Sequence, residues 1–69
     1  MSSLTYFIVS SLKHETIYLR SDGTWTLQIL CRQEWPTFDE AQVVLHNYRR
    51  KAKKGDPIKF AYVRTCTDA

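Results

Sequence analysis

The sequence contains few of the residues that build catalytic loops. Only two glycines and two prolines occur among its 69 residues, and both glycines lie where turns are expected. It has no glycine-rich phosphate loop and no G-x-S-x-G nucleophile motif. Asp39 and Glu40 fall in the first turn of an expected helix, where carboxylates complement the helix dipole. The sequence therefore predicts a protein that is not an enzyme and uses no cofactor.

Cysteine and histidine are equally scarce. His14, Cys31, His46 and Cys66 are separated by 17, 15 and 20 positions, whereas metal sites use ligands in close pairs. We therefore assign no metal ligands. The two cysteines are expected to be buried free thiols, as in most cytosolic proteins.

Long hydrophobic runs are absent as well. No apolar stretch approaches the roughly 18 residues that a membrane span needs. The start, Met-Ser-Ser-Leu, lacks the basic residues and long apolar stretch of a signal peptide. We expect a complete, soluble protein of the cytoplasm, and of the host cytoplasm if it is phage-encoded. Its length allows a single domain, residues 1–69, and its 43% apolar content suffices for one small core.

Charge, in contrast, is abundant and unevenly distributed. Residues 1–48 carry three bases and five acids, a balance of about −2. Residues 49–69 carry seven bases and two acids, a balance of about +5. Any surface that attracts anions must therefore be built from the C-terminal part of the chain.

Aromatic and β-branched residues predict four strands. These cover residues 4–10, 16–20, 25–31 and 58–65. The first has apolar residues on both faces, which is expected of a central strand. In the last, Ile58, Phe60 and Tyr62 are expected to share one face.

A Ser-Asp-Gly-Thr segment predicts a hairpin between the second and third strands. A three-residue loop that ends at a left-handed Gly23 pairs Leu19 with Trp25 and Ile17 with Leu27. A two-residue loop would turn the strand over and leave its apolar side chains opposite polar ones. Because register is set by the buried face, we expect the three-residue loop.

This register predicts an outer sheet face. It carries Tyr18, Arg20, Thr26 and Gln28. Tyrosine and arginine are enriched among interface hot spots, so Tyr18 and Arg20 are candidate partner-binding residues. Either Tyr6 or Phe7 is expected to join this face, because neighbouring strand residues point to opposite sides.

A helix follows, opened by a capping box of Thr37 and Glu40. Its apolar stripe consists of Ala41, Val44, Leu45, Tyr48 and Ala52. Gly55 and Pro57 are expected to end it, and Trp35 to fold onto its start. The order β-β-β-α-β predicts an α+β domain with a mainly antiparallel sheet and one helix packed on one face.

The helix ends in a dense group of cations. These are Arg49, Arg50, Lys51, Lys53 and Lys54. Five cations in six residues could neutralise several phosphates, and Lys59 and Arg64 extend the patch. The alternative is that they complement the helix dipole and keep a solvated face charged.

Two segments resemble short phage-encoded inhibitors of RNA polymerase. Residues 37–41 (T-F-D-E-A) and 62–66 (Y-V-R-T-C) correspond to a helix opening with T-x-D-E-A and a later strand containing V-x-x-V-R-x-C. The similarity covers under half of the chain. Small anti-CRISPR proteins share the general form, being short, single-domain and without catalytic motifs. The resemblance implies a phage accessory protein that inhibits a host macromolecule, with Arg64 contacting the partner.

A different resemblance points to nucleic acid. A strand–turn–strand unit with Trp25, followed by residues 38–41 opening a basic helix, is similar to the arm-binding domains of phage and transposon integrases. Those domains read the major groove with a three-stranded sheet, so the resemblance implies DNA binding.

Two functions follow from these observations. The first is a non-catalytic phage-type protein that modulates or inhibits a host or phage macromolecule through a protein interface. The second is a nucleic-acid-binding module that uses the basic helix end. The predicted partner-binding residues are Tyr18, Arg20, Arg49, Arg50, Lys53, Lys54 and Arg64. Neither function involves a membrane or a small-molecule substrate.

Overall fold

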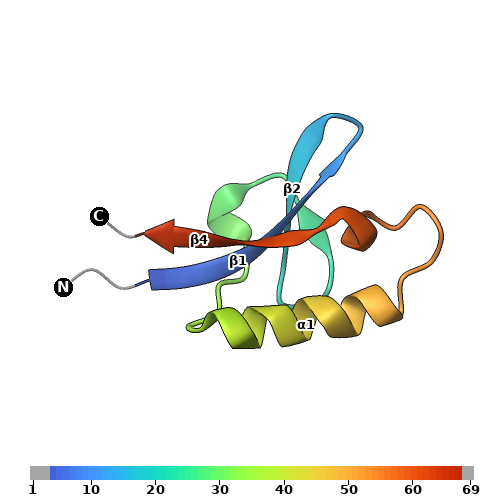
Figure 1. Ribbon diagram of the computed structural model, residues 1–69. Coiled ribbons are helices and arrows are strands. Elements are labelled where there is room, and N and C mark those ends of the chain that lie inside the picture. Colours follow the sequence, from blue (N-terminus) through green and yellow to red (C-terminus); the bar gives the residue numbers. More distant parts are fainter. Residues whose placement is uncertain (1–3, 68–69) are drawn as a thin grey trace.

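A computed structural model describes residues 4–67 as one antiparallel sheet with a helix against it (Figure 1). The strands are β1 (Leu4–Leu12), β2 (Glu15–Leu19), β3 (Trp25–Thr26) and β4 (Tyr62–Thr67), in the order β3-β2-β1-β4. The helix α1 (Phe38–Arg50) is flanked by two short 3₁₀ turns, η1 (Ile29–Cys31) and η2 (Pro57–Phe60). The predicted α+β class and the central position of β1 are both confirmed. Within the described range, no helix combines the length and apolarity needed to cross a membrane.

The core lies between α1 and one face of the sheet. Its buried cluster consists of Ile8, Leu19, Leu45, Ile58 and Ala61. The predicted helical stripe points into it: Ala41 and Leu45 are buried, and Val44 and Tyr48 are half-buried. Thr37 caps the helix as expected, because its hydroxyl accepts a hydrogen bond from the Glu40 amide at 3.2 Å.

The hairpin register is also confirmed. Leu19 pairs with Trp25, and the Arg20 amide donates to the Thr24 carbonyl at 2.8 Å, which leaves three residues in the loop. Gly23 has a φ of +87°, the left-handed conformation that glycine adopts readily. Two hydrogen bonds from Thr24, from its hydroxyl and its amide, hold the pKa of Asp22 below its usual range.

The expected strand over residues 25–31 is wrong beyond its second residue. β3 ends at Thr26, so the predicted pairing of Ile17 with Leu27 does not form. The Thr26 hydroxyl accepts a hydrogen bond from the Gln28 amide at 3.1 Å. This local partner replaces a ladder bond and allows the chain to turn into η1.

The expected strand over residues 58–65 begins late. Asp56 accepts a hydrogen bond from the Ile58 amide, and Pro57 follows this cap, so the chain first forms η2. The alternation of side chains expected of a strand therefore does not hold in the first part of the predicted segment, residues 58–60. Ile58 is buried, whereas Phe60 is 70% exposed and Tyr62 is exposed, so these three side chains do not share a buried face.

Two segments pair with the same edge of β1, the edge that faces away from β4. β2 pairs with β1 only from Val9 to Leu12, because it then diverges toward β3. Trp35 fills the vacated edge by exchanging two backbone hydrogen bonds with Tyr6, at 2.9 and 2.8 Å. Its side chain packs against the core, and it lines a hollow together with Asp39, Glu40 and Val43 of α1.

Candidate partner-binding surface

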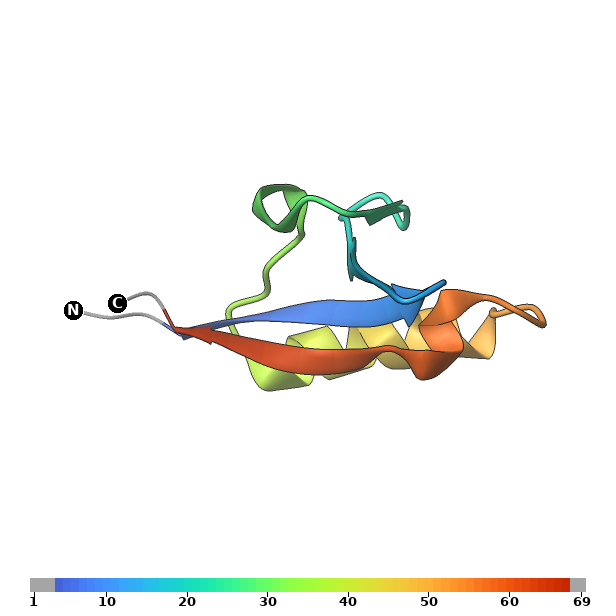
Figure 2. The ribbon, with the colours of Figure 1, turned by 90° about the horizontal axis from the view of Figure 1, so that it is seen from above.

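The two faces of β1 have different neighbours. Ile8 points into the core beneath α1, whereas Phe7 and Val9 point to the opposite side, which we call the far face. Figure 2 shows α1 on one side of the β1–β4 layer and η1 with β3 on the other. Tyr6 contacts Phe38 of α1 edge-to-face, with ring centroids 5.9 Å apart. Phe7 is thus the member of the pair that points away from the helix.

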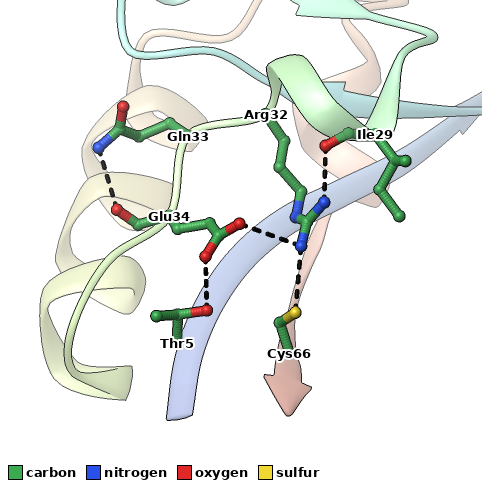
Figure 3. A network of polar contacts seen from close by, with 6 residues as sticks. All are labelled: Thr5, Ile29, Arg32, Gln33, Glu34 and Cys66. Carbon is green, nitrogen blue, oxygen red and sulfur yellow. Dashed lines mark hydrogen bonds and ion pairs between the residues drawn. The ribbon is translucent and has the colours of Figure 1, made fainter. Parts of the chain in front are cut away.

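Arg32 covers the far face at Phe7. Its guanidinium carbon lies 4.5 Å from the centre of the Phe7 ring, and its side chain is only 9% exposed. One terminal nitrogen, Nη1, donates to the Ile29 carbonyl at 2.6 Å. The other, Nη2, contacts Glu34 Oε2 at 3.0 Å and donates to Cys66 Sγ at 3.1 Å (Figure 3). The guanidinium therefore links η1 to both β1 and β4.

Glu34 extends this network. The other carboxylate oxygen of Glu34, Oε1, accepts a hydrogen bond from the Thr5 hydroxyl at 2.6 Å. The Gln33 side chain donates to the backbone carbonyl of Glu34 at 3.0 Å (Figure 3). Charge-assisted hydrogen bonds of this kind are stronger than neutral ones. The network fixes the whole segment from η1 to Trp35 across the far face.

Three aliphatic side chains in and just before η1 remain exposed to solvent. Leu30 is 92% exposed, and Leu27 and Ile29 are also exposed; we call these three the aliphatic turn. Sequence reasoning missed it, because Leu27 and Ile29 were assigned to the inner face of a strand. The available signal was Leu30, which breaks the alternation of polar and apolar residues in this segment.

Tyr18 and Arg20 do not form the surface predicted for them. Tyr18 is half-buried on the far face, where its ring is tilted against Phe7 with centroids 5.8 Å apart. Arg20 lies beyond the end of β2 and lines a groove with side chains of α1, on the helix side of the sheet. The assumption that they share a face is wrong, because strand alternation ends at Leu19.

Other residues join Tyr18 on the far face. Val9 pairs with Tyr18 on one side and with Tyr62 on the other, so the three form one cross-strand row. Arg64 pairs with Phe7 and is therefore on the same face. Tyr62 and Arg64 are both exposed. The far face thus carries two tyrosines and an arginine, and η1, which contains Ile29 and Leu30, lies on the same side of the sheet (Figure 2).

The basic helix end divides into two kinds of cation. Arg49 donates from Nη2 to the Ala61 carbonyl at 2.7 Å and so joins α1 to the start of β4. Arg50, Lys53 and Lys54 are exposed, and within residues 4–67 they form no ion pair. Arg49 therefore has a structural contact, whereas the other three are free to meet an external anion.

The cysteines are both free thiols, as predicted, but the prediction that both are buried is wrong, because Cys31 is exposed and Cys66 is half-buried. The reason is the early end of β3, which places Cys31 in η1 instead of a strand. In the described part of the chain, no three His, Cys, Asp or Glu side chains gather closely enough to hold a metal ion.

Comparisons of the chain with protein-family models, with curated proteins and with solved structures found no match.

Proposed function

We propose that this is a non-catalytic, phage-type accessory protein that modulates or inhibits a host macromolecule by binding it through the far face. The observation that carries the proposal is the aliphatic turn, held outward by a buried arginine. Contiguous exposed aliphatic side chains are unfavourable in water and commonly mark a protein interface.

The surroundings of the turn support the same function. Tyrosine and arginine, here Tyr62 and Arg64, are the residue types enriched at interface hot spots. Because the Arg32 network already fixes the turn, binding would order few additional groups and lose little entropy. The partner that fits is a protein with an apolar pocket for Leu30 and an acidic side chain opposite Arg64.

The test starts with capture of partners from lysate of a bacterial host, followed by affinity measurement with the purified partner. Leu30→Asp is expected to weaken binding at least about tenfold, because a carboxylate would have to enter an apolar pocket. Val43→Asp is the matched control, since Val43 is an exposed aliphatic residue of α1 on the helix side. Equal affinity of Leu30→Asp and the unaltered protein would refute this interface.

Nucleic-acid binding is the second candidate, and the free cations Arg50, Lys53 and Lys54 favour it. Such binding releases counterions, so its affinity should fall steeply as salt rises. Replacing all three by glutamine should abolish a gel shift with generic duplex or single-stranded DNA. Absence of a shift with the unaltered protein at low salt would exclude this candidate.

A further inference from the structure

A groove lies between α1 and the end of β2, and none of the three residues of the aliphatic turn lines it. It is lined by Arg20, Ser21, Gln33, Trp35, Val44, Asn47, Tyr48 and Lys51. Its volume of about 360 Å³ falls in the range of small-molecule sites. Figure 1 shows the chain after β2 running down to α1.

The groove is positively charged. Arg20 and Lys51 line it, and its lining includes no carboxylate. Among the described residues neither cation forms an ion pair. Asp22 is the acidic group that acts on Arg20, but its carboxylate is held by two hydrogen bonds from Thr24. The groove therefore has two cations that are available to an anionic ligand.

The positive charge continues beyond the groove at the helix end, whereas two other hollows that share Lys51 or Trp35 with the groove include Asp56, Asp39 and Glu40. A second hollow of about 330 Å³ is lined by Asn47, Arg50 and Lys51. Because Asn47 and Lys51 line both, the two hollows adjoin. An anion in the groove would thus meet Lys51 with Arg50 close behind it, at the helix end where the chain is most basic.

The groove also has two fixed aromatic side chains. The Trp35 backbone is held by its two hydrogen bonds to Tyr6. Tyr48 packs against the hairpin loop, where a Cβ placed on Gly23 would lie 3.1 Å from the tyrosine oxygen. Within residues 4–67, the side-chain amide of Asn47 makes no hydrogen bond, so its donor and acceptor groups are available to a ligand.

We propose that this groove binds a nucleoside phosphate. The base would stack on Trp35 and hydrogen-bond to Asn47, and the phosphate would lie between Arg20 and Lys51. Stacking on an aromatic ring combined with phosphate neutralisation is how proteins hold unpaired nucleotides. The ligand is either a free mononucleotide or one nucleotide of a single strand. The proposal does not depend on the far face. If the ligand is one nucleotide of a single strand, the proposal assigns nucleic-acid binding, the second candidate function, to this groove.

The experiment is an NMR titration of the ¹⁵N-labelled full chain with AMP, with a short oligoadenylate strand, and with adenosine and inorganic phosphate as partial ligands. AMP should shift the Trp35 indole and Asn47 side-chain signals saturably, and adenosine or phosphate alone should bind at least about tenfold more weakly. Similar affinities for AMP and the strand indicate a free nucleotide. Much tighter binding of the strand indicates single-stranded nucleic acid.

Matched variants decide whether the groove is responsible. Lys51→Gln and Arg20→Gln should each lower affinity severalfold, whereas Lys13→Gln, at an exposed cation outside the groove lining, should not. Leu30→Asp should leave AMP binding unchanged, which separates this site from the partner-binding face. The proposal is overturned if AMP and the strand both leave the Trp35 signal unmoved. It is also overturned if binding persists in Lys51→Gln but is lost in Lys13→Gln.

Discussion

At the scale of single residues, backbone strain is concentrated in the turn between β1 and β2. Leu12 pairs with Glu15, so only Lys13 and His14 form the turn, and their φ values are +53° and +71°. Two-residue hairpin turns with two positive φ angles favour Asn-Gly. Side chains with a Cβ are disfavoured there by roughly 1 kcal/mol or more each.

Replacing Lys13 by Asn and His14 by Gly should therefore stabilise the protein by about 1 kcal/mol, because the strain is relieved. Urea denaturation is the measurement, and the midpoint should rise. Gly23→Ala is the opposing control: it introduces strain at a φ of +87° and crowds Tyr48, so its midpoint should fall. A double variant with an unchanged midpoint would show that this turn is unstrained.

At the scale of elements, α1 is specified by its own residues. The Thr37 cap, the two acids of the first turn and the basic last turn are all local signals, and each is present in the structure. Propensity and capping act within a few residues, so tertiary context did not alter the helix start. The helix nevertheless ends at Arg50, before Gly55, and Ala52 packs on the core from beyond its end.

Thr37→Ala should cost about 1 kcal/mol of stability, because the Glu40 amide loses its side-chain partner. Thr37→Ser keeps the hydroxyl and should restore most of the loss. Thermal and urea denaturation followed by circular dichroism measure both. If alanine and serine behave alike, the cap contributes nothing.

At the scale of the whole molecule, Arg32 joins segments that are far apart in sequence. It touches Phe7 of β1, Cys66 of β4 and Ile29 of η1, and it pairs with Glu34. Because Glu34 is 39% exposed, its ion pair is partly screened by water. The hydrogen bonds and the stacking on Phe7 are therefore the larger contributions.

Arg32→Met should lower the free energy of unfolding by about 1.5–3 kcal/mol, since a charged hydrogen-bond donor is lost from a nearly buried position. Amide exchange across η1 should accelerate as well. Arg32→Lys should not restore stability, because lysine lacks the planar fork that reaches two acceptors. Arg50→Met is the control on an exposed arginine and should change little. Unchanged exchange at η1 in Arg32→Met would show that the network does not hold the turn.

The sequence by itself determined whatever depends on near neighbours: the capped helix with its apolar stripe, the hairpin register at Leu19 and Trp25, and the left-handed Gly23. Only the tertiary structure decided what crosses the far face. Residues 25–31 have strand-like composition, but the chain leaves the sheet after Thr26 and places Arg32 against Phe7 of β1, Cys66 of β4 and Glu34. The same departure leaves Leu30 exposed in η1, whereas Tyr18 and Arg20 are separated because β2 ends at Leu19. Contacts between residues some 30 positions apart, Thr5 with Glu34 and Arg32 with Cys66, hold this segment against the sheet, and local sequence patterns do not predict such contacts.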